Sequence, residues 1–388
     1  MEETIEDLIE ELKNKDGKVR SQAAISIGFI RDSRIIDPLI GALKDKDENV
    51  RRSAAYSLGM VTDERVIEPL IEAIKDEDDE VRSAVVGAFF GREDEKAIEP
   101  LIKALTDENS EVRSNAASSL TYLNNEKVVE PLIRALGDSE LEVRVNAAFA
   151  LSVMKGNEMS ELVFETFIEG VNKGDEYLQS TSILGFSYLE DKKAVEPLIR
   201  ILNDKNSDVR VDAAQALGNL KDTRAVGPLI DVLNNGEPDI NIDVIIALGE
   251  LGDKRAINPL LENLNNEDEI IQKWTAISLC KLENNKKIEL IFKILCESLE
   301  HEIDGIRWDA AFELIQMNCN ACPNSLYDVI IEILEDGDEY ARKKAILGLG
   351  QIGNKEALKH LKYVEMNDKD EKVREEAKKI IRKLNNEN

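Results

Sequence analysis

The strongest constraint on this chain is a repeat with a period of 31 residues. A proline followed by two aliphatic residues marks the clearest copies, and it occurs at Pro38, Pro69, Pro100, Pro131, Pro197, Pro228 and Pro259. Degenerate copies of the same pattern fill the rest of the 388 residues, which gives twelve copies and leaves no stretch for a separate domain. A fixed period of roughly 20–50 residues is typical of a solenoid. We therefore expect one elongated repeat domain over residues 1–388.

Each copy has the pattern of a helix, a turn and a second helix. In residues 63–91 the first segment carries apolar residues on one helical face, at Ile67, Leu70, Ile71 and Ile74. Pro69 falls in the first turn, where a missing N–H costs no hydrogen bond, and Asp63 is the expected N-cap. The second segment combines a Val-Arg pair, small residues and Leu-Gly, which indicates close helix approach. We predict an all-α fold, a right-handed α-solenoid of helix-turn-helix repeats.

An aspartate precedes the arginine of the Val-Arg pair by six residues in seven copies, as Asp76 precedes Arg82. A carboxylate in the turn can pair with an arginine of its own repeat or of the neighbouring one. Such partly buried pairs fix the register of stacking more than they add stability. The pattern lapses in copies six, eight and nine, where looser stacking is expected. The substituted positions are Lys173 with Gln179, Asn235 with Asn241, and Asn266 with Gln272.

The repeat text resembles the short HEAT-like repeat family, the type first associated with phycobilisome bilin lyases. The matching segments read DERVIEPLIEAIKDEDDEVR and VRVDAAQALGNLKDTRAVGPLIDVL, and the resemblance covers essentially the whole chain. It implies a HEAT-like solenoid. It implies little about activity, because repeats of this kind serve lyases, hydroxylases, DNA glycosylases and plain scaffolds.

Charge and hydropathy exclude several classes of partner. The net charge is −28 and 33% of the residues are charged, which favours basic partners and repels nucleic acid. No apolar run approaches the roughly 18 residues of a membrane helix. The acidic N-terminus already belongs to the first repeat and cysteines are few, so we expect no signal peptide and a cytoplasmic protein.

The variable positions of the second helices are expected to line the concave side of the solenoid. In copies one to six they include Phe29, Tyr56, Tyr122, Phe149 and Tyr188; in copies seven to ten they include Asp212, Asp243, Trp274, Trp308, Asp309 and Phe312. The same exposed positions hold Ser53, Asn146, Lys273 and Ile277. Aromatic residues are enriched among interface hot spots, so the set predicts a groove with aromatic anchors and an acidic stretch. The alternative is that curvature of the superhelix partly buries these side chains.

The function that follows is a non-enzymatic scaffold or adaptor that binds a protein partner in its groove. The partner is expected to have a basic surface, and the chain is expected to be a monomer without a cofactor. No P-loop, Rossmann fingerprint or GxSxG occurs, and the two histidines provide a single His-Glu pair, His301-Glu302. The alternative is a lyase-like enzyme or assembly factor of the bilin lyase type, acting on a tetrapyrrole or a partner subunit.

Insertions interrupt the period near residues 155–160, 297–305 and 317–324. Insertions in repeat proteins map to loops, often on a functional face, although tolerated drift explains them equally well. The third insertion holds Cys319 and Cys322 in a CxxC pattern, which suits a redox pair, half a zinc site or two inert thiols. Zinc would need two further ligands, and Cys280 and Cys296 resemble small core residues.

Overall fold

The computed structural model describes residues 4–123, 125–154, 160–205, 207–237, 240–282, 288–316, 324–352 and 355–386. These ranges form twenty-four α-helices and hold no β-strand, which confirms the predicted all-α solenoid of twelve hairpins. None of the helices within them is both long and apolar enough to cross a bilayer. Two compact units, residues 1–197 and 198–388, divide the chain within α13 (Val195–Asn203).

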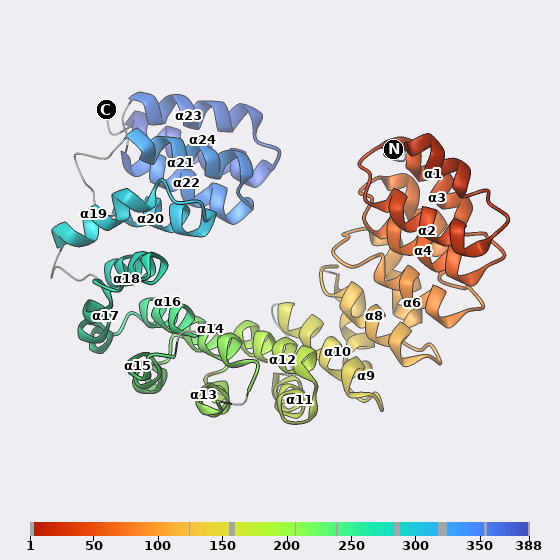
Figure 1. Cartoon of the computed structure of the whole chain (residues 1–388), viewed down its shortest axis with the longest axis horizontal. Helices are drawn as coiled ribbons and strands as arrows, with labels where there is room; N and C mark the ends of the chain where they lie inside the picture. The colour runs from red at the N-terminus through yellow and green to blue at the C-terminus, as the bar shows by residue number, and fades with distance from the viewer. Residues whose placement is uncertain are drawn as a thin grey trace. The chain divides into compact units, whose positions relative to one another are not determined.

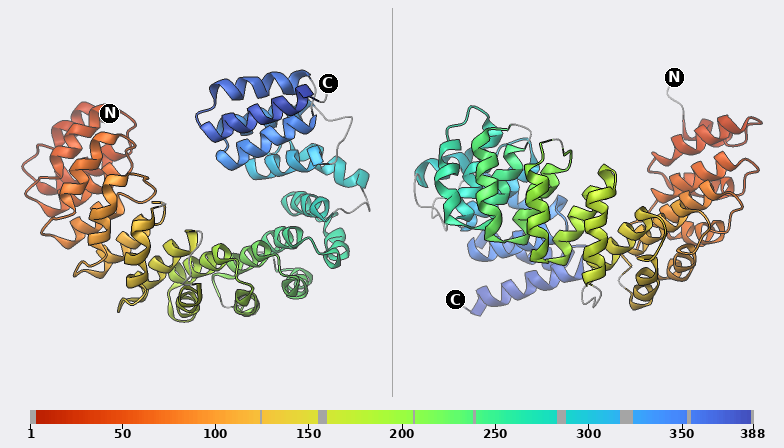
Figure 2. Two further views of the ribbon diagram at one scale, coloured as in Figure 1. Left: turned by 180° about the vertical axis from the view of Figure 1, so that it is seen from behind. Right: turned by 90° about the horizontal axis from the view of Figure 1, so that it is seen from below.

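The first unit contains six helical hairpins, which Figures 1 and 2 show in red to yellow-green. Its first helices are α1 (Ile5–Glu11), α3 (Ile36–Ala42), α5 (Ile67–Ala73), α7 (Ile98–Ala104), α9 (Val129–Ala135) and α11 (Ser160–Lys173). Its second helices are α2 (Gly17–Gly28), α4 (Glu48–Gly59), α6 (Asp79–Gly87), α8 (Ser110–Leu120), α10 (Leu141–Val153) and α12 (Glu176–Leu189).

The second unit repeats this arrangement. After α13, its first helices are α15 (Val226–Asn235), α17 (Ile257–Asn263), α19 (Ile288–Ser298), α21 (Asn324–Asp336) and α23 (Lys355–Asn367). Its second helices are α14 (Arg210–Leu220), α16 (Asn241–Leu251), α18 (Glu269–Lys281), α20 (Asp304–Gln316), α22 (Glu339–Ile352) and α24 (Glu371–Asn386). In both units each second helix packs on the second helix of the next repeat, and the first helices form a separate layer beside them (Figure 1).

A short 3₁₀ turn precedes the first helix in each of the seven repeats that carry the proline. In the third repeat this turn is η2 (Glu64–Val66), and the Asp63 carboxylate accepts a hydrogen bond from the Arg65 N–H at 2.9 Å. The predicted cap is therefore confirmed, although it caps the 3₁₀ turn, and α5 begins after it with Pro69 in its first turn. The other turns are η1 (Ser33–Ile35), η3 (Glu95–Ala97), η4 (Glu126–Val128), η5 (Lys192–Ala194), η6 (Thr223–Ala225) and η7 (Lys254–Ala256).

Small residues let neighbouring second helices approach closely, as the Leu-Gly pattern predicts. A Cβ placed on Gly59 would lie 3.1 Å from the Cα of Ala88 on the next second helix. A Cβ on Gly249 would lie 2.8 Å from the Cβ of Ser278. The contact at Gly249 is too short for a Cβ, and the one at Gly59 would force a small shift of the neighbouring backbone, so glycine allows the close spacing of these helices.

The predicted Asp–Arg pairs join neighbouring repeats. Arg82 donates two hydrogen bonds to the carboxylate of Asp107 in the next repeat, both at 2.9 Å, and a third at 3.0 Å to the backbone carbonyl of Asp76 in its own repeat. We call this series the Arg ladder. Its other rungs are Arg20–Asp45, Arg51–Asp76, Arg113–Asp138, Arg144–Glu169, Arg210–Glu237, Arg307–Glu332 and Arg342–Asp368.

Where the arginine is missing, glutamine contacts its own repeat. Gln179 donates to the carbonyl of Gly174 at 3.2 Å, and Gln272 donates to the carbonyl of Leu264 at 2.9 Å. These bonds satisfy a helix end but do not tie one repeat to the next. Looser stacking at these repeats stays a prediction.

The structure describes one of the three insertions in full. The segment 297–305 comprises the end of α19, a turn and the start of α20. Residues 155–159 and 317–323, which include Cys319 and Cys322, lie outside the described residues. Cys280 is half-buried, and burial together with the nearby Glu313 raises the pKa of its thiol to about 12, which makes it unreactive at neutral pH.

Candidate functional site

Exposed aromatic side chains follow the second helices of the first unit. Phe29, Tyr56, Tyr122 and Tyr188, which the sequence singles out, are 68%, 55%, 43% and 51% exposed, and Phe149 is half-buried. They come from five of the six second helices or from the residues directly after them. Apolar rings this exposed contribute little to the core and are available for contact.

Aromatic contacts between neighbouring repeats order part of this surface. The ring centroids of Phe90 and Tyr122 are 5.4 Å apart, and those of Phe149 and Tyr188 are 5.7 Å apart, both with nearly perpendicular rings. Edge-to-face geometry is the favoured arrangement of aromatic pairs. The rings are therefore partly fixed before any partner arrives.

A hollow of about 840 Å³ opens among α2, α4, α6 and α8. Its apolar wall consists of Tyr56, Met60 and Phe90, and Gly87 lies among its lining residues. Gly87 stands six residues after the valine of its repeat, the register that Tyr56 occupies in the preceding repeat. A Cβ on Gly87 would be 3.8 Å from its nearest neighbour, so the glycine leaves space where another repeat places a ring. We call this hollow the Gly87 groove.

Polar side chains along the groove bind one another across repeats. Asn115 Nδ2 donates to Ser83 Oγ at 2.9 Å, and Ser83 Oγ donates to Glu111 Oε1 at 2.9 Å. Arg52 pairs with Glu80 of the next repeat. Because these groups are already hydrogen-bonded or ion-paired, the polar wall is ordered before a partner binds.

Two polar positions predicted to be exposed in the first unit are buried. Ser53 is 6% exposed and its Oγ lies 2.9 Å from Ser21 Oγ. Asn146 is 4% exposed and donates to Ser114 Oγ at 2.8 Å. The prediction was wrong here because the stacking of adjacent second helices covers the position three residues after the valine.

Sequence reasoning missed Phe90, which lines the groove, and Arg92, which follows it two residues later in the chain. Arg92 donates to the carbonyls of Ala88 and Leu58, both at 2.8 Å, so it ties the ends of two second helices together. Burial lowers the pKa of Arg92. Gly91 between them has φ +74°, a left-handed conformation that favours glycine. This repeat has glycine at the positions six and ten residues after its valine, where other repeats place larger side chains. These two glycines were the sign in the sequence that a hollow could form.

The second unit presents a charged surface on its second helices. Glu250 of α16 accepts a hydrogen bond from Lys281 of α18 at 2.6 Å, and Asp309 and Glu313 of α20 lie beside them. Lys344 of α22 lies 5.0 Å from the centroid of the Phe312 ring and 5.1 Å from that of Tyr340. Cations over ring faces are attracted by the aromatic quadrupole. The charged cluster, as we name it, comprises Glu250, Lys281, Asp309, Glu313 and Lys344.

Burial governs the ionisation of this cluster. It raises the pKa of Glu313 to about 7 and raises the pKa of Asp309, and the lysines only partly offset it. Burial also opposes the charge of Lys281, but the hydrogen bond with Glu250 and the charges of the neighbouring carboxylates together outweigh burial and raise the pKa of that lysine. Glu313 therefore changes its protonation near neutral pH.

The remaining predicted site residues of the second unit are half-buried. Trp308 Nε1 donates to Glu332 Oε1 at 3.1 Å, which places this tryptophan against a rung of the Arg ladder. Asp243 accepts a hydrogen bond from Gln215 of the preceding repeat at 2.9 Å. The half-buried set comprises Asp212, Asp243, Trp274, Trp308, Asp309 and Phe312. The structure groups Asp309 and Phe312 with the charged cluster.

Lys273 and Ile277 were predicted to be exposed and are 4% and 0% exposed. That prediction was wrong because both residues belong to α18 and are covered where α18 packs on its neighbouring second helices. The Lys273 ammonium pairs with Glu269 one turn earlier on the same helix.

Metal chemistry finds no support in the described ranges, where no group of three or more His, Cys, Asp or Glu side chains could hold an ion. His301 Nδ1 accepts a hydrogen bond from the N–H of Ile303 at 3.1 Å, so this histidine stabilises a turn.

A family model for HEAT repeats matches residues 5–89, 98–167, 164–241, 195–280, 227–315 and 327–387. The chain belongs to the HEAT-repeat family. The resemblance to HEAT-like repeats is thereby confirmed. No curated protein matches this HEAT-repeat chain.

Solved structures resemble the chain at low sequence identity, and the first of them shows the same fold. A chain of the Kap95:Nup1 complex matches with a TM-score of 0.65 and 12% identity, over 98% of this chain and 62% of that one. The HEAT-repeat chain thus spans about three fifths of that relative. The CpcE–CpcF complex of phycocyanin lyase from Nostoc sp. PCC7120 matches with a TM-score of 0.46 and 19% identity, over 65% and 96%. E. coli YibA matches with 0.49 and 22%, over 70% and 99%.

Proposed function

We propose that this HEAT-repeat chain is a non-enzymatic scaffold that binds a segment of a partner protein in the Gly87 groove and on the aromatic residues around it. The observation that carries the proposal is the coincidence of a hollow with exposed apolar side chains, Tyr56, Met60 and Phe90, in a single surface. Exposed apolar patches beside a hollow are typical of protein-binding sites.

The energetics favour a partner with apolar anchors. Covering a ring or a thioether such as Phe90 or Met60 contributes about 1.5–3 kcal/mol for each side chain. Contacts that already hold the rings, such as Phe90 against Tyr122, reduce the entropy lost on binding. The chain's charge of −28 accelerates encounter with a partner that carries basic residues beside those anchors.

Filling the groove tests this proposal. In Gly87→Phe a ring occupies the register that holds Tyr56 and Phe149 in other repeats, and an added Cβ at Gly87 meets no atom closer than 3.8 Å. The matched control is Gly41→Phe, because Gly41 is an exposed glycine of the first helix α3 with nothing within 4 Å of its added Cβ.

The measurement is capture of partners from native extract by each protein, with cross-linking and mass spectrometry to locate the contact, followed by titration of the identified partner. We expect Gly87→Phe to lose at least tenfold in affinity and Gly41→Phe to bind as the wild type does. Equal binding by both variants, with both folded, would refute binding in the Gly87 groove.

A further inference from the structure

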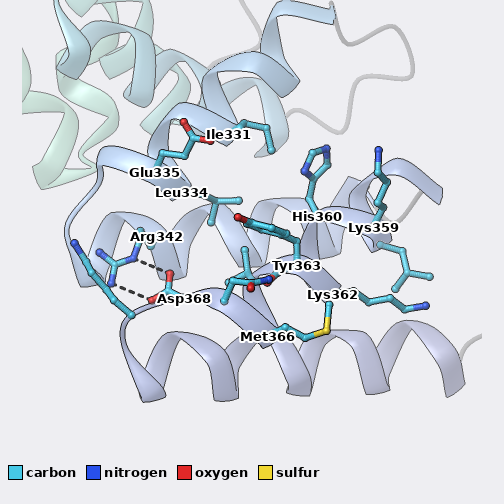
Figure 3. A pocket seen from close by; sticks show the side chains of 14 residues that line it. Ile331, Leu334, Glu335, Arg342, Lys359, His360, Lys362, Tyr363, Met366 and Asp368 are labelled. Atoms are coloured by element: carbon cyan, nitrogen blue, oxygen red, sulfur yellow. Dashed lines mark hydrogen bonds and ion pairs between the residues drawn. The ribbon is translucent and has the colours of Figure 1, made fainter.

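A larger groove lies in the other helical layer, between the first helices α21 and α23 of the second unit (Figure 3). It encloses about 1450 Å³. Ile331 and Leu334 come from α21, and Tyr363 and Met366 come from α23. The Arg342–Asp368 rung of the Arg ladder lies at one end, where Figure 3 marks its hydrogen bonds. We call it the α21–α23 groove.

The groove exists because both helices carry apolar residues beyond those that the core uses. In α23 the buried face holds Leu361 and Val364, whereas Tyr363 and Met366 are 65% and 72% exposed. Such exposed apolar area on a helix whose core face is already satisfied indicates a second contact surface.

An earlier repeat supplies an internal comparison. The space between α5 and α7 lies beside the equivalent rung, Arg82–Asp107, and encloses about 620 Å³. Pro100 lines that space, whereas His360 occupies the corresponding register of α23. The α21–α23 groove has more than twice the volume of that space, so the first helices of the last two repeats leave more room between them than those of the earlier pair.

The charge of the groove is opposite to that of the chain. Four cationic side chains line it against two carboxylates, which leaves a local charge of +2 in a chain of −28. Arg342 and Asp368 neutralise each other. Among the residues that the structure describes, neither Lys362 nor Lys369 forms an ion pair, and both are exposed. A basic rim therefore borders an apolar floor.

We propose that the α21–α23 groove is a second docking site, which binds an acidic amphipathic helix of a partner protein. The apolar floor fits side chains spaced at i, i+3, i+4 and i+7 on one helical face. Carboxylates on the flanks of that helix would pair with Lys362 and Lys369, and a basic helix would be repelled. The volume exceeds the 300–1,000 Å³ of ordinary small-molecule sites. This site is separate from the Gly87 groove and does not depend on the proposed function.

The probe is a fluorescein-labelled helical peptide of about four turns, with leucines on one face and glutamates on its flanks. Its counterpart has lysine in place of every glutamate. Both are titrated by fluorescence anisotropy against the full chain and its variants at low and moderate salt. Tyr363→Ser/Met366→Ser removes the apolar floor, and Lys362→Glu/Lys369→Glu inverts the rim. Tyr340→Ser is the matched control, because Tyr340 is 68% exposed on a second helix.

We expect the glutamate peptide to bind the wild type at least tenfold more tightly than the lysine peptide. Either double variant should lose at least tenfold, the rim variant mainly at low salt, and Tyr340→Ser and Gly87→Phe should bind normally. Equal binding of the two peptides, no binding, or binding that survives both double variants would overturn the proposal. If sedimentation shows a dimer of the chain that both double variants dissociate, the occupant is a second copy and a partner helix is wrong.

Discussion

The second helices of the two units present different side chains on their surfaces. In the first unit the surface near the Gly87 groove is built from serine and asparagine, and rings such as Tyr56 stand exposed above them. In the second unit the charged cluster occupies the surface, and Lys344 lies over the rings of Phe312 and Tyr340. The same repeat pattern can therefore leave aromatic rings exposed, as in the first unit, or place a lysine ammonium over them, as in the second.

The Arg ladder differs in parallel. The first four rungs of the first unit, such as Arg82–Asp107, all use an aspartate of the next turn. In the second unit glutamates replace it in two rungs, as in Arg307–Glu332, and Gln272 makes no inter-repeat bond of this kind. The first unit thus combines successive Asp rungs with exposed rings on its second helices, whereas the second unit combines a mixed ladder with the charged cluster on its second helices. The predictions below test how far this contrast extends to stability and binding.

The largest effect is expected from breaking a ladder rung. Arg82 and Asp107 side chains are 10% and 16% exposed, so Arg82→Ala leaves a mostly buried carboxylate without its partner. Removing one member of a buried pair costs about 3–5 kcal/mol. Gln272→Ala loses a single neutral hydrogen bond, about 1 kcal/mol. Urea denaturation with hydrogen exchange followed separately in each unit measures both changes.

Arg52→Ala is the control for this comparison, because the Arg52–Glu80 pair is 43% and 62% exposed. Exposed pairs contribute little, so we expect under about 0.5 kcal/mol. If Arg82→Ala were no more costly than Arg52→Ala, the ladder would fix register without adding stability.

The next effect concerns the protonation of Glu313. Its pKa is raised from 4.5 to about 7, so the folded state holds a proton that the unfolded chain releases, and stability falls as pH rises from about 4.5 to 7. Glu313→Gln removes this loss. We expect it to be about 3 kcal/mol more stable than the wild type at pH 8 and equal below about pH 4, by urea denaturation at each pH.

Glu332→Gln should behave in the opposite way. The hydrogen bond from Arg307 lowers the pKa of Glu332, so this carboxylate contributes stability above the unfolded pKa and loses it as pH falls. The variant should be less stable than the wild type at pH 8. If both variants shift stability in the same direction at pH 8, the electrostatic contrast between these carboxylates is wrong.

The sequence predicts the features that depend on short spacings. The period, the paired helices and the Asp63 cap follow from residues close in sequence, whereas the recurring Asp and Arg indicate pairing but leave open whether it joins neighbouring repeats. The distance between stacked second helices depends on contacts between repeats, which short sequence spacings do not predict. Because that distance is small, Asn146 and Lys273 are buried. The charged cluster combines residues of four helices, and no single repeat indicates that Glu313 lies near Lys281. Phe90 was missed because it stands one position from the expected register.

A smaller effect is expected from Trp308, which the sequence groups with the anchors. Trp308→Phe keeps an aromatic ring but removes the N–H that donates to Glu332. We expect a loss of about 1 kcal/mol in the second unit, because the carboxylate loses one of its donors. Tyr122→Phe in the first unit, whose hydroxyl forms no hydrogen bond with the described residues, should change stability by less. Thermal unfolding at neutral pH compares the two, and equal losses would mean that the Trp308 bond adds nothing.

The smallest change in stability and a large change in binding are expected together at Tyr56. Its side chain is 55% exposed and lines the Gly87 groove, so Tyr56→Ala should cost under about 0.5 kcal/mol while weakening partner binding at least tenfold. Tyr340→Ala removes a ring that is even more exposed and lies beside Lys344 of the charged cluster, and it should leave binding in the groove unchanged. Titration of the captured partner against both folded variants decides between the two surfaces. If Tyr340→Ala abolishes binding and Tyr56→Ala does not, the charged surface of the second unit is the partner site, and the exposed rings of the first unit need another explanation.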